Sequence, residues 1–279
     1  MTAAVHEGSG TWLLQHESFE LWRDSNDALL WCPGILGAGK TYLSAIVSNH
    51  LRKHYHDQNV VVLNLFVGYT DRESRSLTFL IAALLKQVIQ RQPDLARDVL
   101  ENHSIHFLKK TFPKLEDLTH LLRKALCIFQ RSFIVIDALD EVEEPDRLRL
   151  LELLSCNDVA IMVTSRPIPT VSELFATTES CDMCENKCSK ILTCCERCSS
   201  STNRCVTCHK GSSVCLEESH FTLKKFAASR VDVRACQDDI ENYIQWRIDH
   251  EPKILKWVNL KKISREEIVT TVASRADGM

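Results

Sequence analysis

The amino-acid sequence predicts an α/β fold in which a parallel sheet carries helices on both faces and a small cysteine-rich unit is inserted late in the chain. Three observations support this prediction. Short, continuously apolar runs alternate with segments of helical periodicity, as expected for strands that are buried from above and below. A glycine-rich turn joins the first of these runs to a helix. Nine of the thirteen cysteines fall between Cys181 and Cys215.

The composition is that of an ordinary globular protein. Hydrophobic residues make up 44% of the 279 residues, charged residues 25%, and the net charge is −3, which fits one principal domain. Lysine and arginine are spread along the chain and outnumbered by acids, so we expect no nucleic-acid partner. The N-terminus lacks the pattern of a secretory signal, and no apolar run approaches the roughly 18 residues of a membrane span. We therefore expect a cytoplasmic protein with no membrane partner.

The first predicted elements surround the glycines. Residues 28–32, "ALLWC", form a buried strand that ends at a Pro-Gly pair, and residues 40–53 have the apolar spacing of a helix. The β-branched run at 59–67 predicts a second strand. Residues 77–90 predict a helix with an almost wholly apolar face. Together these segments give the first half of a sheet with crossover helices.

The alternation continues in the second half of the chain. We expect a helix at 114–129, a third strand within "RSFIVIDALDE", a helix at 146–154 and a fourth strand that ends at Thr164. After the cysteine-rich stretch, "RVDVRA" at 230–235 predicts a fifth strand and "DDIENYIQWRI" an amphipathic helix. The predicted divisions are a helical lead-in (1–27), a core (28–176), a cysteine-rich insertion (177–222), the end of the core (223–250) and a helical segment (251–279). The last helix is predicted to begin at Ser264, where Ser264 and Glu267 form an S-x-x-E capping box.

The glycine-rich turn matches the phosphate-binding motif G-x-x-x-x-G-K-[ST] in full, between a strand and a helix. Glycines let successive backbone N–H groups turn inward around phosphate oxygens, and the helix N-terminus adds partial positive charge. We expect Lys40 to reach the β- and γ-phosphates and the Thr41 hydroxyl to be a Mg²⁺ ligand. The predicted nucleotide-binding residues are Gly34, Ile35, Leu36, Gly37, Ala38, Gly39, Lys40, Thr41 and Tyr42.

Acidic and basic residues follow the later strands. The third strand delivers Asp137 to the carboxyl end of the sheet, where an aspartate can hold Mg²⁺ directly or through water. Asp140 and Glu141 are predicted to orient or deprotonate the attacking water, and the sequence does not choose between them; a solvated loop or a helix cap is the alternative. Arg166 follows the fourth strand and is predicted to sense a γ-phosphate, the alternative being a surface arginine before a proline turn.

The strand at 59–67 lies between the phosphate-loop strand and the Asp137 strand along the chain. This order suits the class of P-loop NTPases in which a strand inserts between those two and leaves room for a separate water-activating acid. Three tryptophans flank the phosphate loop: Trp12, Trp22 and Trp31. Packing against the sheet is favoured for them over stacking on a nucleotide base.

These segments resemble the NACHT domains of the STAND class of P-loop NTPases, in particular the nephrocystin-like NACHT domains of fungal NOD-like receptors. The resemblance is carried by "GTWLLQHESFELW", "LLWCPGILGAGKTYLSAIV", "FIVIDALDE", "VTSRP", "VDVRACQDDIENYI" and "ADGM". Most specific is "DALDE", in which a small residue and two further acids follow the metal-binding aspartate. The resemblance implies an ATP- or GTP-dependent oligomerisation switch in immune or self-recognition signalling. No N-K-x-D guanine-reading motif is present, so ATP is favoured over GTP.

The sequence departs from that family at two points. Leu36 stands where the family commonly has proline, and the chain stops at "ADGM", where the family would continue into a helical and winged-helix lid. No obvious arginine finger is present either. We therefore expect nucleotide binding with slow or absent hydrolysis, and no regulated switching. Self-association or a protein partner is expected beside the nucleotide. The alternative is a truncated, non-catalytic interaction module; a small-molecule kinase is disfavoured because nothing resembles an acceptor site.

The cysteine-rich stretch contains three C-x-x-C pairs. Two residues between cysteines let both thiolates reach one tetrahedral ion, and a reducing compartment disfavours disulfides, so we predict structural Zn²⁺. A disordered redox-sensitive loop and a segment that never folds are the alternatives. The predicted zinc ligands, with their pairing left open, are Cys181, Cys184, Cys188, Cys195, Cys198, Cys205, Cys208 and Cys215. The unit is expected to stand off the core as a knob that serves recognition of a partner or rigidity, and not catalysis.

Overall fold

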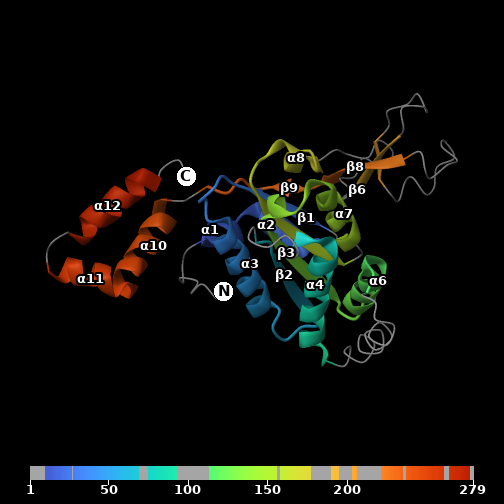
Figure 1. Ribbon diagram of the computed structural model, residues 1–279, viewed down its shortest axis with the longest axis horizontal. Coiled ribbons are helices and arrows are strands. Elements are labelled where there is room, and N and C mark those ends of the chain that lie inside the picture. The colour runs from blue at the N-terminus through green and yellow to red at the C-terminus, as the bar shows by residue number, and fades with distance from the viewer. Residues whose placement is uncertain are drawn as a thin grey trace.

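A computed structural model gives the fold of the chain (Figure 1). It describes residues 10–26, 28–68, 75–93, 113–155, 158–176, 190–194, 203–205, 221–234, 237–260 and 264–276. A central sheet flanked by helices forms the body of the molecule. A group of three helices, α10 to α12, stands on one side of this body, and a second, smaller sheet projects from the opposite side.

Five parallel strands form the central sheet, in the order β2-β3-β4-β1-β9. This result confirms the predicted parallel sheet. The strands are β1 (Leu29–Pro33), β2 (Val60–Phe66), β3 (Arg131–Asp137), β4 (Val159–Ser165) and β9 (Ser229–Arg230). The strand that inserts between β1 and β3 is β4. The order along the chain suggested that the strand at 59–67 lies between them. This is wrong, because that segment forms β2, which lies on the other side of β3 at the edge of the sheet.

The fifth strand is shorter than the sequence predicts. Only Ser229 and Arg230 form a regular strand, but the chain continues beside β1 as far as residue 233. The Val231 N–H donates to Trp31 O (2.9 Å) and the Val233 N–H donates to Pro33 O (2.7 Å). This extended segment therefore borders the start of the phosphate loop.

Helices cover both faces of the sheet, as expected. Along β3, Phe133 and Val135 belong to the apolar core under α1, α2 and α3, whereas Ile134 and Ile136 belong to the core under α4, α6 and α7. Such strands are apolar throughout because both of their faces are buried. The helices of the body are α1 (Thr11–Leu14), α2 (Glu17–Asp24), α3 (Lys40–His54), α4 (Leu77–Arg91), α6 (Leu115–Leu126), α7 (Glu144–Leu154) and α8 (Pro169–Ser172), with a 3-10 turn, η3 (Leu139–Glu141).

The edge strand β2 is closed by side chains from the helices on either side of it. The Asn64 N–H donates to Gln87 Oε1 (2.9 Å), and Gln87 Nε2 donates back to Asn64 O (2.8 Å), as a neighbouring strand would. Arg52 Nη2 donates to Val62 O (3.2 Å). Backbone groups at the edge of a sheet attract further strands unless they are satisfied in some such way.

The second sheet has the order β5-β8-β6-β7, formed by β5 (Phe175–Ala176), β8 (Phe221–Ala227), β6 (Lys190–Cys194) and β7 (Asn203–Cys205). Its first strand along the chain, β5, lies at the end of the predicted core, and the sheet also includes strands of the cysteine-rich stretch. The side chains of all eight predicted zinc ligands lie outside the described residues, although the backbone of Cys205 is part of β7. Within the described residues no group of three or more metal-ligating side chains occurs.

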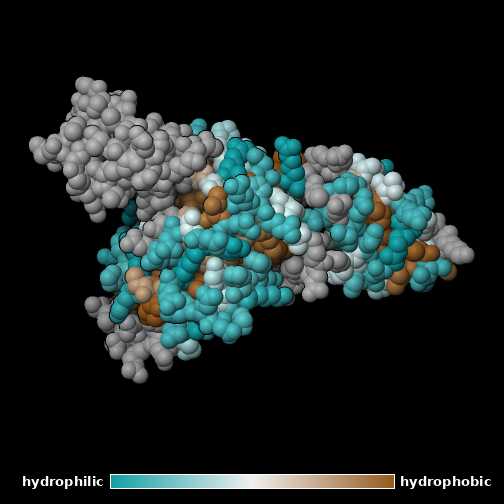
Figure 2. All heavy atoms as spheres, turned by 180° about the vertical axis from the view of Figure 1, so that it is seen from behind, coloured by the Kyte–Doolittle hydropathy of each residue, from teal (hydrophilic) through white to brown (hydrophobic). Residues whose placement is uncertain are grey.

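The helices α10 (Gln237–His250), α11 (Pro252–Asn259) and α12 (Arg265–Ala276) pack around Ile244, Ile248 and Ala273, apart from the two cores of the sheet. The last helix begins where predicted, and the Glu267 N–H donates to Ser264 Oγ (3.0 Å). Seen from behind, hydrophobic patches interrupt the hydrophilic surface of this unit (Figure 2). None of the helices in the described parts of the chain has both the length and the apolar character to cross a membrane.

Candidate functional site

The phosphate loop joins β1 to α3, and its glycines are required by its geometry. Gly37 and Gly39 both have φ of 83°, in the left-handed region that favours glycine. Gly34 is needed for a different reason: a Cβ atom there would lie 2.7 Å from Val233 O, which is closer than atoms can pack. The Gly34 N–H also donates to Ser165 O (3.0 Å). The loop is therefore held between the ends of β4 and the segment after β9.

Lys40 is held inside the loop that precedes it. Its Nζ donates to Gly34 O and to Ile35 O, each at 2.7 Å. An ammonium group has three donors, so one remains for a further acceptor. The pKa of Lys40 is lowered, mainly by desolvation. The negative charges of Asp140 and Asp137 oppose this shift, and the positive charge of Arg166 adds to it. The lysine, two of the predicted acids and the predicted sensor thus lie in one electrostatic environment.

Asp137 ends β3 and receives hydrogen bonds from three hydroxyl groups. Thr41 Oγ1 donates to Oδ2 (2.7 Å), and Ser44 Oγ (3.0 Å) and Thr164 Oγ1 (2.6 Å) donate to Oδ1. These bonds satisfy a carboxylate that is almost fully buried. Because the Thr41 hydroxyl donates its hydrogen to Asp137, the lone pairs of its oxygen remain available to a cation. The two predicted Mg²⁺ residues are therefore already in contact.

The chain turns sharply after Asp137. Ala138 has φ of 63°, which is rare for a residue other than glycine and costs least when the side chain is small. Its N–H donates to Thr164 Oγ1 (3.1 Å), which fixes the turn to the neighbouring strand β4. The turn leads into η3, which carries the two acids Asp140 and Glu141. The left-handed backbone of this turn therefore explains why a small residue follows Asp137 in "DALDE".

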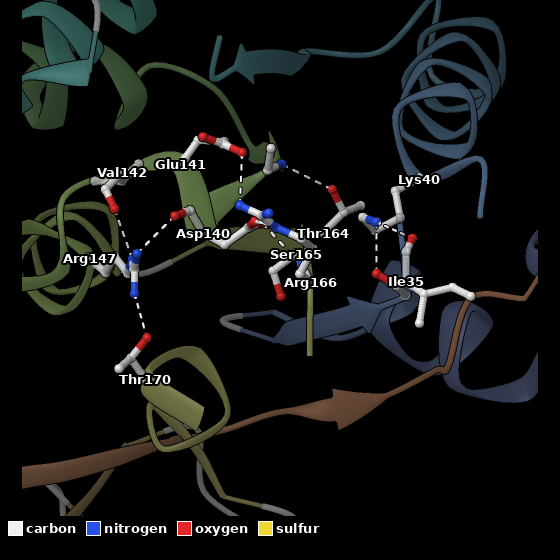
Figure 3. A network of polar contacts seen from close by, with 12 residues as sticks. Ile35, Lys40, Asp140, Glu141, Val142, Arg147, Thr164, Ser165, Arg166 and Thr170 are labelled. Carbon is white, nitrogen blue, oxygen red and sulfur yellow. Dashed lines mark hydrogen bonds and ion pairs between the residues drawn. The ribbon is translucent and has the colours of Figure 1, made fainter. Parts of the chain in front are cut away.

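The three predicted catalytic residues meet in one ion-pair cluster (Figure 3). The carboxylate of Asp140 accepts from both the backbone N–H (3.0 Å) and the Nε of Arg166, and Arg166 Nη2 donates to Glu141 Oε1 (3.0 Å). The side chain of Asp140 is 2% exposed, that of Glu141 25% and that of Arg166 45%. The hydrogen bond from Arg166 to Asp140, with the charges of Asp140 and Glu141, raises the pKa of the guanidinium.

Arg147, on α7, lies behind this cluster. Its Nε donates to Val142 O, its Nη1 to Thr170 Oγ1 and its Nη2 to Asp140 O, each at 2.8 Å. It therefore ties the loop after β3 to α8, which follows β4. In the view of Figure 3, Arg166 lies between Arg147 and Lys40.

Other residues near the loop are apolar. Leu36, at the tip of the loop, occupies one of the positions where the motif allows any residue. Its side chain makes little contact, since the residue is 80% exposed. Tyr42 is partly buried and packs against the core under α3. Trp22 and Trp31 are buried, and their indole N–H groups donate to Ile161 O (3.0 Å) and Ser165 Oγ (2.9 Å). The prediction that these two pack against the sheet is confirmed.

Sequence reasoning missed three residues of the site. Ser44 lies three residues after Thr41 and hence on the same face of α3, a signal that could have revealed it. Thr164 comes beside Asp137 only because β4 is the neighbour of β3, with Val163 paired to Ile136. Nothing in the sequence around Arg147 distinguishes it from an ordinary residue of an amphipathic helix.

Comparisons with known proteins give one family and a number of solved structures, of which two are described here. The model of the family described as "Nephrocystin 3, N-terminal" matches residues 8–166. The Orc1 protein of Aeropyrum pernix, solved in complex with DNA, is 18% identical with a TM-score of 0.37, and the match covers 52% of this chain and 34% of that one. PCH-2 of C. elegans is 10% identical with a TM-score of 0.33, covering 88% and 45%. The chain thus spans less than half the length of either. No curated protein matches.

Proposed function

The chain belongs to the nephrocystin 3 N-terminal family, whose model matches more than half of it, and we propose from this premise that it binds a nucleoside triphosphate with Mg²⁺. Its parallel sheet has a P-loop NTPase-like fold. The matched stretch contains the whole phosphate loop, Asp137, Asp140, Glu141 and Arg166. These are the residues that the proposal requires.

The observation that carries the proposal is the contact between Thr41 and Asp137, made beside the lysine of the loop. A hydroxyl that donates to a carboxylate keeps its lone pairs for a hard cation, and oxygen ligands are those that Mg²⁺ takes. We propose that Thr41 holds the metal, with Asp137 as its partner. Lys40 would bind phosphate oxygens with the third N–H of its ammonium group, the one that does not donate to a loop carbonyl.

The cluster around Arg166 supports a role at the γ-phosphate. In the described residues Arg166 Nη1 has no hydrogen-bond partner, so this part of the guanidinium is available to a phosphate oxygen. Asp140 is buried with its carboxylate bound to Arg166, which favours Glu141 as the acid that orients water. Glu141 is itself paired with Arg166. We therefore propose slow hydrolysis, because this pair must open before Glu141 can accept a proton.

At a finer level, we propose that the chain resembles the switch module of NACHT-type signalling NTPases and prefers ATP to GTP, because its sequence has no N-K-x-D guanine-reading motif. The support for this is the "DALDE" sequence, whose alanine adopts the left-handed turn described above. Calorimetric titration with ATP, ADP and GTP, in Mg²⁺ and in EDTA, tests the proposal. We expect ATP to bind most tightly, and to bind more weakly in EDTA than in Mg²⁺. Absence of binding by all three nucleotides would contradict the proposal and favour an interaction module.

Replacement of Asp137 by asparagine is expected to weaken ATP binding in Mg²⁺ by about 10-fold to 100-fold, as when a partner of a metal ligand is lost. The amide keeps the size of the side chain but not its charge. In EDTA the variant and the unchanged protein should bind ATP with the same affinity, and calorimetry measures the affinity in both conditions. Asp57→Asn is the matched control, because Asp57 is 82% exposed and lies beyond α3. An unchanged affinity for ATP in Asp137→Asn, with Mg²⁺ present, would remove Asp137 from the metal site.

A further inference from the structure

Arg147 is buried although it makes no ion pair with any residue that the structure describes. Within the described part of the chain, its three hydrogen bonds end on two carbonyl oxygens and one hydroxyl, and none ends on a carboxylate. The whole residue is 8% exposed. Burying a cation against neutral acceptors costs free energy that an apolar side chain would not. Stability alone therefore does not explain an arginine here.

The three acceptors of Arg147 belong to two separate segments. Asp140 and Val142 lie in the loop after β3, and Thr170 lies in α8, four residues after Arg166. The guanidinium is a rigid planar fork, so its three nitrogens fix these acceptors relative to one another. A lysine in its place has one nitrogen and cannot span them.

We propose that Arg147 is a positioning residue that sets the place of Arg166 through Asp140. Asp140 is held from both ends: its carbonyl oxygen accepts from Arg147, and its carboxylate accepts from the backbone N–H and the Nε of Arg166. Movement of the carbonyl therefore moves the carboxylate and, with it, the guanidinium of Arg166. Figure 3 shows Arg147 and Arg166 on the two sides of Asp140.

The consequence concerns discrimination between nucleotides and rests on the proposed function, in which Arg166 contacts the γ-phosphate. Arg166 is not part of a regular strand, since β4 ends at Ser165 and a proline follows it. Its direction therefore depends on the side-chain contacts with Asp140 and Glu141. Arg147 holds the first of these contacts in place, so we expect it to influence the preference for ATP over ADP without touching the nucleotide.

Two measurements on Arg147→Lys test the inference. The first is the exchange rate of the Arg166 amide hydrogen, followed by NMR in nucleotide-free protein. We expect exchange at least about tenfold faster, because the acceptor Asp140 is no longer fixed. The second is the ratio of ATP to ADP affinity in Mg²⁺, which should fall by about 3-fold to 10-fold while ADP affinity is kept.

Two further variants keep the test decisive. Thr170→Val removes one acceptor and preserves shape, so both effects should appear in the same direction and be smaller, even where Arg147→Lys does not fold. Arg149→Lys is the matched control, because Arg149 lies on the same helix and makes an exposed pair with Glu152. Unchanged amide exchange in Arg147→Lys and Thr170→Val overturns the inference. If the exchange is faster in the variants but the unchanged protein does not prefer ATP to ADP, the inference about Arg147 stands and the role proposed for Arg166 is overturned.

Discussion

Lys40→Ala is expected to lower the affinity for Mg-ATP at least about 100-fold, which corresponds to the loss of about 2.7 kcal/mol. In the proposed complex the ammonium would supply both a charge and a hydrogen-bond donor to the phosphates, and each charge-assisted bond contributes about 1.5 to 3 kcal/mol. The substitution also frees the carbonyl oxygens of Gly34 and Ile35, which Lys40 now holds at 2.7 Å. Calorimetric titration measures the change.

The control for this experiment is Lys53→Ala. Lys53 is an exposed residue in the last turn of the same helix, α3, so its loss removes a charge without reaching the loop. We expect this variant to bind ATP as the unchanged protein does. The melting temperatures of both variants should show that they fold. ATP binding that survives in Lys40→Ala would place the nucleotide away from the loop.

Trp22→Ala is expected to reduce the free energy of unfolding by about 3 to 5 kcal/mol, the usual cost of removing a large buried aromatic side chain. Trp22 is 1% exposed, its ring meets that of Phe133 edge-on with the ring centres 5.5 Å apart, and its N–H donates to Ile161 O. The substitution would leave a cavity and remove this hydrogen bond. Urea denaturation followed by circular dichroism measures the change.

Trp257→Ala is the comparison for Trp22→Ala, because Trp257 is 52% exposed on α11. We expect it to change the free energy of unfolding by less than about 1 kcal/mol. Since domains of this size are stable by only about 5 to 15 kcal/mol, Trp22→Phe provides a milder variant that keeps an aromatic ring. Equal stability of Trp22→Ala and Trp257→Ala would contradict the buried role of Trp22.

The order of strands and helices in the body was predictable because each strand is an apolar run and each helix has an apolar face. Helix α3, for example, was expected at 40–53 and spans Lys40–His54. The order of the strands in space was not, because periodicity reports which faces are buried but not which strand is the neighbour. The place of β4 between β1 and β3 follows from pairing that no local pattern contains.

The same limit applies to the candidate site. The places of the glycine-rich loop, between β1 and α3, and of Asp137, at the end of β3, could be predicted because each directly follows an apolar run in the sequence. Their hydrogen-bond partners could not, since Thr164 reaches Asp137 from another strand. The choice between Asp140 and Glu141 was open in the sequence because both follow the same strand. Their different burial, 2% against 25% of each side chain exposed, is a property of the folded chain.

The side chains along β2 have a consequence for how copies of this protein can meet. Gln87 occupies both backbone groups of Asn64, and Arg52 occupies the carbonyl of Val62. A second molecule cannot extend the sheet at these positions without first displacing them. Copies that meet at these positions of β2 would therefore use side-chain contacts that depend on sequence, and not a continuous ladder of backbone bonds.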